Sequence, residues 1–464
     1  MRFTATSWMR RFPGADILAK RLKGSSADGK AAGRMAVSSF AVRVAGAGLA
    51  YFSQVILARL MGAHDYGIYS VAWTVVIVLG VIACGGFSTS AGRFLPQYRE
   101  TGNFDGLRGF LRTSRQAAFL FGAVIAALGM GLIYLLRPII EQYYVQPLMI
   151  VLLVLPVFAV GLVQDGIARS YDWPFIAMLP NFIWRPLAIL VLLVFLVVAG
   201  YPATAQVTVI VAVLATVSTV LYQYLHLGKR LAKKVPSGPA RFELKTWLAV
   251  SLPLLMVDGF IQLITSADVI MISFFQSPDE VAIYFAASRT LALVHFVYFA
   301  VRAASAHRFS SFTHNNDAKG LSAYTKQATH WTFWPSLAAG AGLLVVAPLL
   351  LRLFGSDFES GYQLIAVLMI GVLARASVGP ADALLSMTGH QKTCAGIYAT
   401  TFAINVLLNL LLIPALGLMG AAIATSIAII FEATALALAA KRKLNVTTFV
   451  LSLLFLPRDP QVDH

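Results

Sequence analysis

Twelve long apolar stretches recur along the chain, and they restrict its fold more than any other feature of the sequence. A helix needs about 20 predominantly apolar residues to cross the hydrocarbon core of a membrane. Charged residues make up only 12% of the chain, about half the fraction usual in soluble domains, so lipid must surround most of it. We therefore predict an all-α polytopic membrane protein with transmembrane helices near residues 39–62, 66–91, 115–136, 147–169, 174–199, 204–227, 246–275, 281–306, 328–354, 362–388, 393–415 and 417–440.

The distribution of lysine and arginine supports this topology. If the chain starts in the cytoplasm, 29 of the 36 basic side chains fall on the cytoplasmic side. The outer loops hold only Arg137 and Arg352, with Arg59 near the outer end of the first span. A miscounted helix would invert every later loop and destroy this alternation. We predict a multi-pass protein of the bacterial inner membrane with both termini cytoplasmic. Cytoplasmic basic loops also explain the net charge of +16 without a nucleic-acid partner.

The spans divide into two similar halves. The segment that starts at Gln54 and ends at Tyr69 resembles the segment from Asp268 to Tyr284, with one residue inserted. Six spans per half give repeats that run in the same direction, related by a pseudo-twofold axis along the membrane normal. We predict two six-helix bundles and five regions: a basic cytoplasmic tail (1–38), the N-terminal bundle (39–227), a linker (228–245), the C-terminal bundle (246–440) and a tail (441–464) with an interfacial helix at Val446–Leu456.

Several motifs carry a resemblance to a known family. They are LAYFSQVILARLMGAHDYGIYSVAW followed by GGFSTSAGRFLPQY, then SADVIMISFFQSPDEVAIYFAASR, LLRLFGSDFESGYQLIAVLMIG and LLNLLLIPALGLMGAAIATSIA. In order and spacing the chain resembles polysaccharide and oligosaccharide-lipid flippases over roughly residues 35–440. These belong to the multidrug/oligosaccharidyl-lipid/polysaccharide exporter superfamily. The resemblance implies that the chain moves a lipid-linked sugar from the cytoplasmic to the periplasmic leaflet.

Ionisable side chains within the spans are candidates for the transport site, since such groups normally face a cavity or a partner. Arginine hydrogen-bonds phosphate oxygens in pairs and stays protonated, so it suits a pyrophosphate-linked lipid. Our predicted substrate-binding residues are Arg185, Arg289, Arg375 and Arg43. The predicted ion-coupling residues are Asp258, Glu432 and Asp268.

Each candidate has a simpler interpretation. Asp258 and Arg289 would pair across the seventh and eighth spans, and Glu432 and Arg375 would do likewise. Near the cytoplasmic face, the side chains of Arg43, Arg302 and Asp382 would reach the interface, and His295 would be a hydrogen-bonded packing residue. Prolines interrupt several spans and act either as hinges or as tolerated kinks. Because Pro180 and Pro186 flank Arg185, that span is the predicted mobile element.

Other classes of protein fit less well. Major-facilitator transporters share the topology, but the loop after the second span lacks their charged turn motif. Glycan polymerases and ligases generally display a large outer loop, whereas the outer connections here are short. The sequence has only two cysteines and no phosphate loop, metal-ligand spacing or nucleophile motif. We predict a protein that is not an enzyme and needs no metal or cofactor.

Taken together, the residues and the resemblance predict an alternating-access flippase for a polyprenyl-pyrophosphate-linked oligosaccharide used in surface polysaccharide biosynthesis. Its partners would be that substrate, membrane lipids, and the glycan polymerase and chain-length machinery. A cation-coupled multidrug extruder of the same superfamily is the alternative, and such a protein would favour uncompensated acids in its cavity.

Overall fold

The computed structural model describes the backbone of residues 27–315 and 317–450, with side chains described from Gly46 onward. The described chain is helical throughout and contains no strands. Its elements, in order, are α2 (Ala27–Ala83), α3 (Phe87–Glu100), α4 (Phe104–Leu135), α5 (Gln142–Leu152), α6 (Leu155–Ser170), α7 (Pro174–Leu179), η2 (Pro180–Trp184), α8 (Arg185–Val198), α9 (Ala205–Lys234), α10 (Leu244–Ile272), α11 (Pro278–His314), α12 (Ala318–Phe354), η3 (Ser356–Ser360), α13 (Gly361–Ser377), α14 (Ala381–Met387), α15 (Gln391–Leu416) and α16 (Leu418–Leu444).

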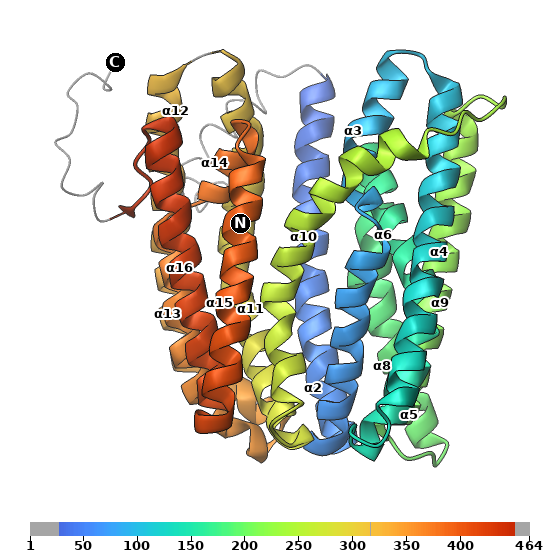
Figure 1. The fold of residues 1–464 in the computed structure, drawn as a ribbon, viewed down its shortest axis with the longest axis vertical. Helices are drawn as coiled ribbons and strands as arrows, with labels where there is room; N and C mark the ends of the chain where they lie inside the picture. The colour runs from blue at the N-terminus through green and yellow to red at the C-terminus, as the bar shows by residue number, and fades with distance from the viewer. Residues whose placement is uncertain (1–26, 316, 451–464) are drawn as a thin grey trace, which may run out of the picture.

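The described helices account for twelve membrane crossings. Ten of them are long and apolar enough to cross, and the α5–α6 pair, bent by 51°, adds an eleventh. The first of the ten, Gly46–Glu100, contains a break at Gly62, where φ is 77° and ψ is 169°. The chain reverses there, as Figure 1 shows. This positive φ suits glycine, and the break makes one apparent helix two spans.

Other predicted spans are interrupted in the structure. The fifth span is the succession α7, η2 and α8, with a π-helical turn at Pro180–Trp184. The tenth span stops at Ser377, and Gly379 turns the chain with φ of 60° before α14 begins. Local chemistry sets several helix starts: the Ser277 hydroxyl and Glu280 form a capping box at α11, and Asn103 caps α4.

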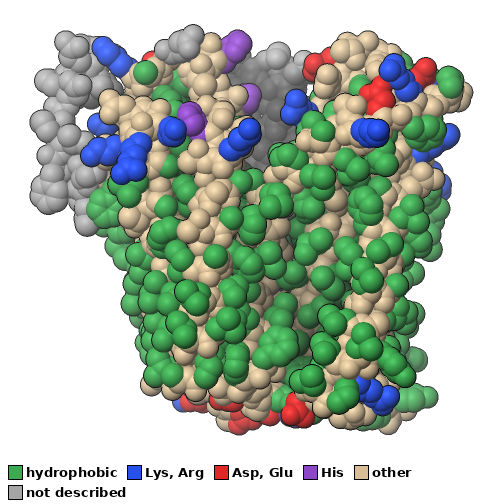
Figure 2. Space-filling model, viewed as in Figure 1, with side chains coloured by type: hydrophobic (Ala, Val, Ile, Leu, Met, Phe, Trp, Pro, Cys, Tyr) green, Lys and Arg blue, Asp and Glu red, His purple; other side chains and the backbone are tan. Residues whose placement is uncertain are grey.

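The surface matches a protein embedded in lipid. Figure 2 shows a broad hydrophobic band between two polar ends. Most of the Lys and Arg side chains in view lie at one end, with His and some Asp and Glu, while Asp and Glu with a few basic side chains lie at the other. The basic end carries the turns that follow α3, α6, α9, α11 and α14. The acidic end carries the turns with Asp65, Glu141, Asp279 and Asp357. Leucine, valine and phenylalanine side chains of the band are exposed, as expected where lipid replaces water.

The helices form two bundles, with α10 running obliquely between them (Figure 1). Its first half contacts α3 of the N-terminal bundle, where Trp247 Nε1 donates to Tyr98 Oη at 2.8 Å and Ser251 Oγ donates to Ser90 Oγ at 2.7 Å. Its second half packs on α15 in the C-terminal bundle. The helix α10 therefore ties the two bundles together near the basic end. The residue bounds of the five predicted regions stay a prediction, and the interfacial helix at 446–456 extends beyond the described residues.

The bundles also meet tightly at the acidic end. Arg59 donates from Nε to the Leu353 carbonyl at 2.7 Å and from Nη2 to the Arg352 carbonyl at 2.6 Å. Gly67 lies so close to α11 that a Cβ placed on it would stand 1.8 Å from the Pro278 carbonyl oxygen. Tyr66 is fully buried there among Phe285, Phe354 and Phe358. This end of the interface is sealed by side chains from both halves.

Candidate functional site

A cavity lies between the two bundles, in two adjoining parts of about 340 and 310 Å³. The first part is lined by α2, η2 and α8 of the N-terminal bundle together with α11. The second part is lined mainly by α10, α11, α13 and α16 of the C-terminal bundle. Both parts share Phe285, Arg289, Ala292 and Phe296 on α11. The helix α11 thus presents one face to both halves of the cavity.

Two of the four predicted phosphate-binding arginines line this cavity without an acidic partner. The Arg185 guanidinium lies over the rings of Trp73 and Phe158, 5.4 and 5.6 Å from their centroids. The Arg289 guanidinium lies 4.4 Å from the Phe285 centroid. Among the described residues, neither guanidinium has a hydrogen bond or an ion pair. Cation–π contact stabilises such a charge while leaving its hydrogen-bond donors available for a ligand.

Arg185 follows directly on the π-helical turn η2. Such turns inside α-helices are frequent at functional sites. Close packing brings this turn against α2, because a Cβ on Gly46 would lie 2.7 Å from Phe182 Cβ. Gly46 therefore serves packing, as small residues commonly do between membrane helices. The expected role of this span as a mobile element stays a prediction.

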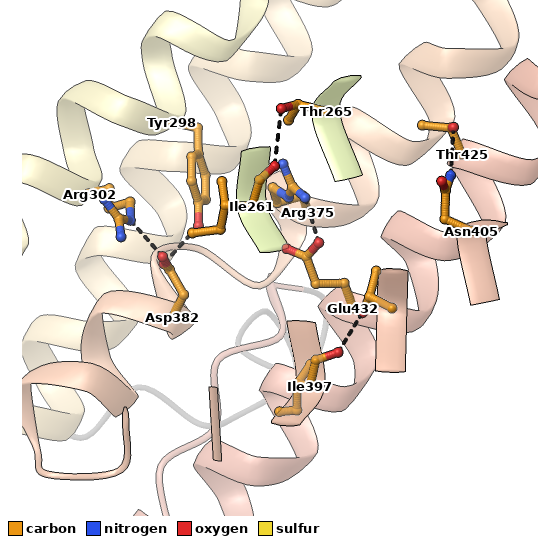
Figure 3. A network of polar contacts seen from close by, with 11 residues as sticks. Ile261, Thr265, Tyr298, Arg302, Arg375, Asp382, Ile397, Asn405, Thr425 and Glu432 are labelled. Atoms are coloured by element: carbon orange, nitrogen blue, oxygen red, sulfur yellow. Dashed lines mark hydrogen bonds and ion pairs between the residues drawn. The ribbon is translucent and has the colours of Figure 1, made fainter. Parts of the chain in front are cut away.

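Arg375 also reaches the second part of the cavity, but its charge is matched. Its Nη2 donates to Glu432 Oε2 at 2.6 Å, and Glu432 is 1% exposed (Figure 3). The pairing proposed for these two residues is confirmed. The Arg375 Nε atom is buried without a hydrogen-bond partner among the described residues. Arg43 lies in α2, and its side chain falls outside the described residues.

The proposed pair of Asp258 and Arg289 is wrong. Asp258 Oδ2 instead accepts a hydrogen bond of 2.5 Å from Thr89 Oγ1 on α3. The sequence indicated how deep Asp258 lies in its span, but not which side of the helix its side chain occupies. Asp258 faces the N-terminal bundle, where it adds to the α3–α10 contact, and it does not line the central cavity.

Asp268 is surrounded by hydrogen-bond donors. Its carboxylate accepts from Thr425 Oγ1 at 2.5 Å, Tyr284 Oη at 2.7 Å, Asn409 Nδ2 at 2.9 Å and Asn405 Nδ2 at 3.2 Å. The side chain is buried at the edge of the cavity's second part. Asn405 is also bonded to Thr425, as Figure 3 shows. No cationic side chain of a described residue pairs with Asp268, so hydrogen bonds alone stabilise this carboxylate.

Sequence reasoning missed the four donors around Asp268. One signal was present: Asn405 and Asn409 stand four residues apart in an otherwise apolar span, which places two amides on one helix face. The Asn409 Oδ1 atom has no hydrogen-bond partner among the described residues, so the cluster retains an unused oxygen. The described residues contain no group of three or more His, Cys, Asp or Glu side chains that could hold a metal ion.

The expectation that the Asp382 side chain reaches the interface is also wrong. Asp382 is 2% exposed and accepts from Arg302 Nε at 2.6 Å and Tyr298 Oη at 2.8 Å (Figure 3). The break between α13 and α14 carries this aspartate into the bundle, where α11 supplies both partners. Asp382 therefore does not extend to the interface. His295 lines the cavity's second part, next to Phe296.

The chain matches a family model described as polysaccharide biosynthesis protein over residues 33–310, more than half of its length. The chain belongs to this family. A second model, MatE, matches residues 253–411. No curated protein matches the chain in sequence. The resemblance expected from the motifs is thereby confirmed.

Solved structures share the fold. An inward-facing multidrug resistance MATE family transporter of the MOP superfamily has a TM-score of 0.73 and 16% identity, over 86% of this chain and 94% of its own. The lipid II flippase MurJ, inward closed, has a TM-score of 0.68 and 16% identity, over 87% of both chains. A MOP superfamily transporter from Pyrococcus furiosus has a TM-score of 0.64 and 17% identity, over 87% and 93%. The chain therefore shares the two-bundle fold of these transporters and flippases.

Proposed function

We propose that this protein is an alternating-access flippase that moves a polyprenyl-pyrophosphate-linked oligosaccharide from the cytoplasmic to the periplasmic leaflet. The observation that carries the proposal is the pair of guanidinium groups, Arg185 and Arg289, in the cavity between the bundles without acidic partners. The family match points in the same direction, because its description names polysaccharide biosynthesis.

Charge supports an anionic substrate. A pyrophosphate offers several oxygens, and two arginines from opposite bundles can each bind two of them. Aromatic rings behind both guanidinium groups leave the fork-like donors free. An organic cation beside these arginines would be repelled by two positive charges, neither of which forms an ion pair with a carboxylate of a described residue. Arg43 and Arg375 remain predicted contacts, although the ion pair with Glu432 favours a structural role for Arg375.

Among the three predicted ion-coupling residues, Asp268 is the best candidate. Glu432 is neutralised by Arg375, and Asp258 is engaged with Thr89 away from the cavity. Asp268 alone combines a buried carboxylate, neighbouring side-chain oxygens and a position at the cavity edge. Binding a proton or a small monovalent cation there would neutralise the carboxylate and alter the contacts among α10, α15 and α16. We propose that this change is coupled to the movement of the bundles.

Orientation follows from the basic and acidic ends of the molecule. We propose that the basic end faces the cytoplasm of a bacterial inner membrane, in line with the positive-inside rule, so that both termini are cytoplasmic. The contacts at Arg59 and Gly67 then lie on the periplasmic side. The sugar head would enter the cavity while the polyprenyl tail stays in lipid, and the bundles near 39–227 and 246–440 would rock about the site. A glycan polymerase and chain-length machinery would take the product.

The alternative is a cation-coupled multidrug extruder. The MatE match over residues 253–411 and the transporter with a TM-score of 0.73 favour it. The two activities differ in the charge they require in the cavity, so substitution of the arginines separates them. A flippase loses activity when Arg185 or Arg289 becomes glutamine, whereas an extruder of cations keeps its activity or gains some.

The test measures the leaflet position of polyprenyl-linked glycan after the protein is depleted in its own cell and replaced by variants. Wild-type protein should restore surface polysaccharide, while Arg185→Gln and Arg289→Gln should leave the glycan on the cytoplasmic face. Arg137→Gln, which removes an equal charge from an exposed outer turn, is the matched control and should restore export. An unchanged glycan distribution after depletion would refute the flippase proposal and favour cation extrusion.

A further inference from the structure

Arg115 on α4 is an intramembrane arginine that the central cavity does not use. The helices α4 and α9 both pack against α6. Arg115 on α4 lies with its guanidinium 5.3 Å from the ring centroid of Tyr224 on α9. The Arg115 Nε and Nη2 atoms are buried and have no hydrogen-bond partner among the described residues. Because an uncompensated guanidinium in a membrane is costly, a partner from outside the described chain is implied.

The depth of these side chains matches lipid phosphates. About 20 helical residues cross the hydrocarbon core, and counting that number back from Leu135, the outer end of α4, leads to Arg115. The same count from Ala205, the outer end of α9, leads to the neighbourhood of Tyr224. Arginine and tyrosine are both suited to this boundary, since each has a polar tip on an apolar body. The pair therefore lies at the level of the headgroups of one leaflet, at the basic end.

The surroundings favour a lipid rather than a soluble anion. Four large apolar side chains within five residues of Arg115 or Tyr224 are well exposed, with exposed fractions of 47% for Phe119, 60% for Leu120, 55% for Leu221 and 50% for Leu225. They would contact acyl chains while the arginine binds the phosphate above them. Arg115 lines neither part of the central cavity.

We propose that Arg115 and Tyr224 form a binding site for the phosphate of an anionic phospholipid in the leaflet at the basic end. The guanidinium fork donates to the phosphodiester oxygens, the tyrosine ring supports the cation, and the acyl chains run along α4 and α9. The site is independent of the substrate proposed for the central cavity. A lipid bound there would anchor the N-terminal bundle in its leaflet while the C-terminal bundle moves relative to it.

The test titrates detergent-purified protein with phosphatidylglycerol and counts bound lipids by native mass spectrometry. Arg115→Gln should weaken binding about tenfold or more, because charge-assisted hydrogen bonds are lost. Tyr224→Leu should weaken it less. Arg112→Gln is the matched control: it removes an exposed arginine one turn away and should bind like wild type. Arg115→Lys keeps the charge and loses the fork, so it should be intermediate and serves as a second variant if the glutamine variant does not fold.

Four outcomes would overturn the proposal. If folded Arg115→Gln bound phosphatidylglycerol with wild-type affinity, this arginine would be excluded as the phosphate contact. If Arg112→Gln lost as much affinity as Arg115→Gln, the loss would reflect general surface charge rather than a site at Arg115. Equal binding of zwitterionic phosphatidylethanolamine would exclude selection for anionic lipid. Inorganic phosphate provides the last comparison: if it alone stabilises lipid-free wild type, but not Arg115→Gln, against thermal unfolding, the site takes a free anion and the lipid assignment fails.

Discussion

Arg375 and Glu432 offer the sharpest test of whether an intramembrane charge serves folding or transport. Their 2.6 Å ion pair is buried, with Glu432 1% exposed and the Arg375 side chain 14% exposed. Replacing either residue by glutamine strands the other charge, which costs about 3–5 kcal/mol in buried pairs. Replacing both removes the stranded charge. The double variant should therefore be more stable than the two single losses predict, by up to about 3 kcal/mol.

The assay follows thermal or denaturant unfolding of purified protein by tryptophan fluorescence, together with glycan export in cells. If the pair is structural, Arg375→Gln/Glu432→Gln should regain most of its stability and still export glycan, while Arg289→Gln folds normally and fails to export. Additive losses of stability would show that the two residues do not depend on each other. A double variant that is stable but inactive would instead make Arg375 a contact for the substrate or Glu432 an ion-coupling group.

Three further predictions concern the ion site and the sealed end. Asp268→Asn keeps the size of the side chain but removes its charge, so transport should lose its dependence on the coupling-ion gradient; an unchanged dependence in reconstituted vesicles would exclude Asp268. Arg59→Gln removes two hydrogen bonds between the bundles, each worth about 0.5–3 kcal/mol, and should raise labelling of a cysteine introduced at Leu57 by a reagent added from outside; labelling at the wild-type rate would contradict a closing role. Gly67→Ala, whose Cβ would meet the Pro278 carbonyl, should force the same end open and abolish export, whereas Gly131→Ala, with open space around it, should be neutral; equal effects of the two would contradict this account of the close approach.

The topology could be predicted because it depends on composition and charge along the chain. Apolar length sets each span, and the alternation of basic loops fixes the number of crossings. Helix ends were less predictable. The helix α11 continues for 37 residues to His314, well past the expected end at 306, because a helix that leaves the membrane remains helical when neighbours support it.

The pairing of charges could not be predicted, because it depends on the rotation of each helix about its axis. A change of one residue turns a side chain by about 100°, so depth says little about which neighbour it meets. Asp258 therefore contacts Thr89 rather than Arg289, and the Asp382 side chain points into the bundle rather than toward the interface. Three of the four partners of Asp268 come from α15 and α16, more than 130 residues away, and among these only the two asparagines could be noticed in the sequence.

The two repeats resemble each other in position but differ in chemistry. In the alignment of the halves, Gln54 occupies the place of Asp268, and Gln54 Oε1 accepts from Tyr66 Oη at 3.0 Å, much as Asp268 accepts from Tyr284. A neutral amide cannot provide a charge for a coupling ion, so only the C-terminal bundle carries a carboxylate at this point of the repeat. The N-terminal bundle contributes Arg185 to the cavity instead. Arg289 on α11 lines both parts of the cavity, and Asp268 on α10 lines the second part. Ion binding at Asp268 can therefore alter the position of Arg289, and with it the binding of the substrate phosphate, through the contact between α10 and α11. We propose that the two bundles have different roles. The coupling ion binds in the C-terminal bundle, and much of the phosphate binding takes place at the boundary with the N-terminal bundle.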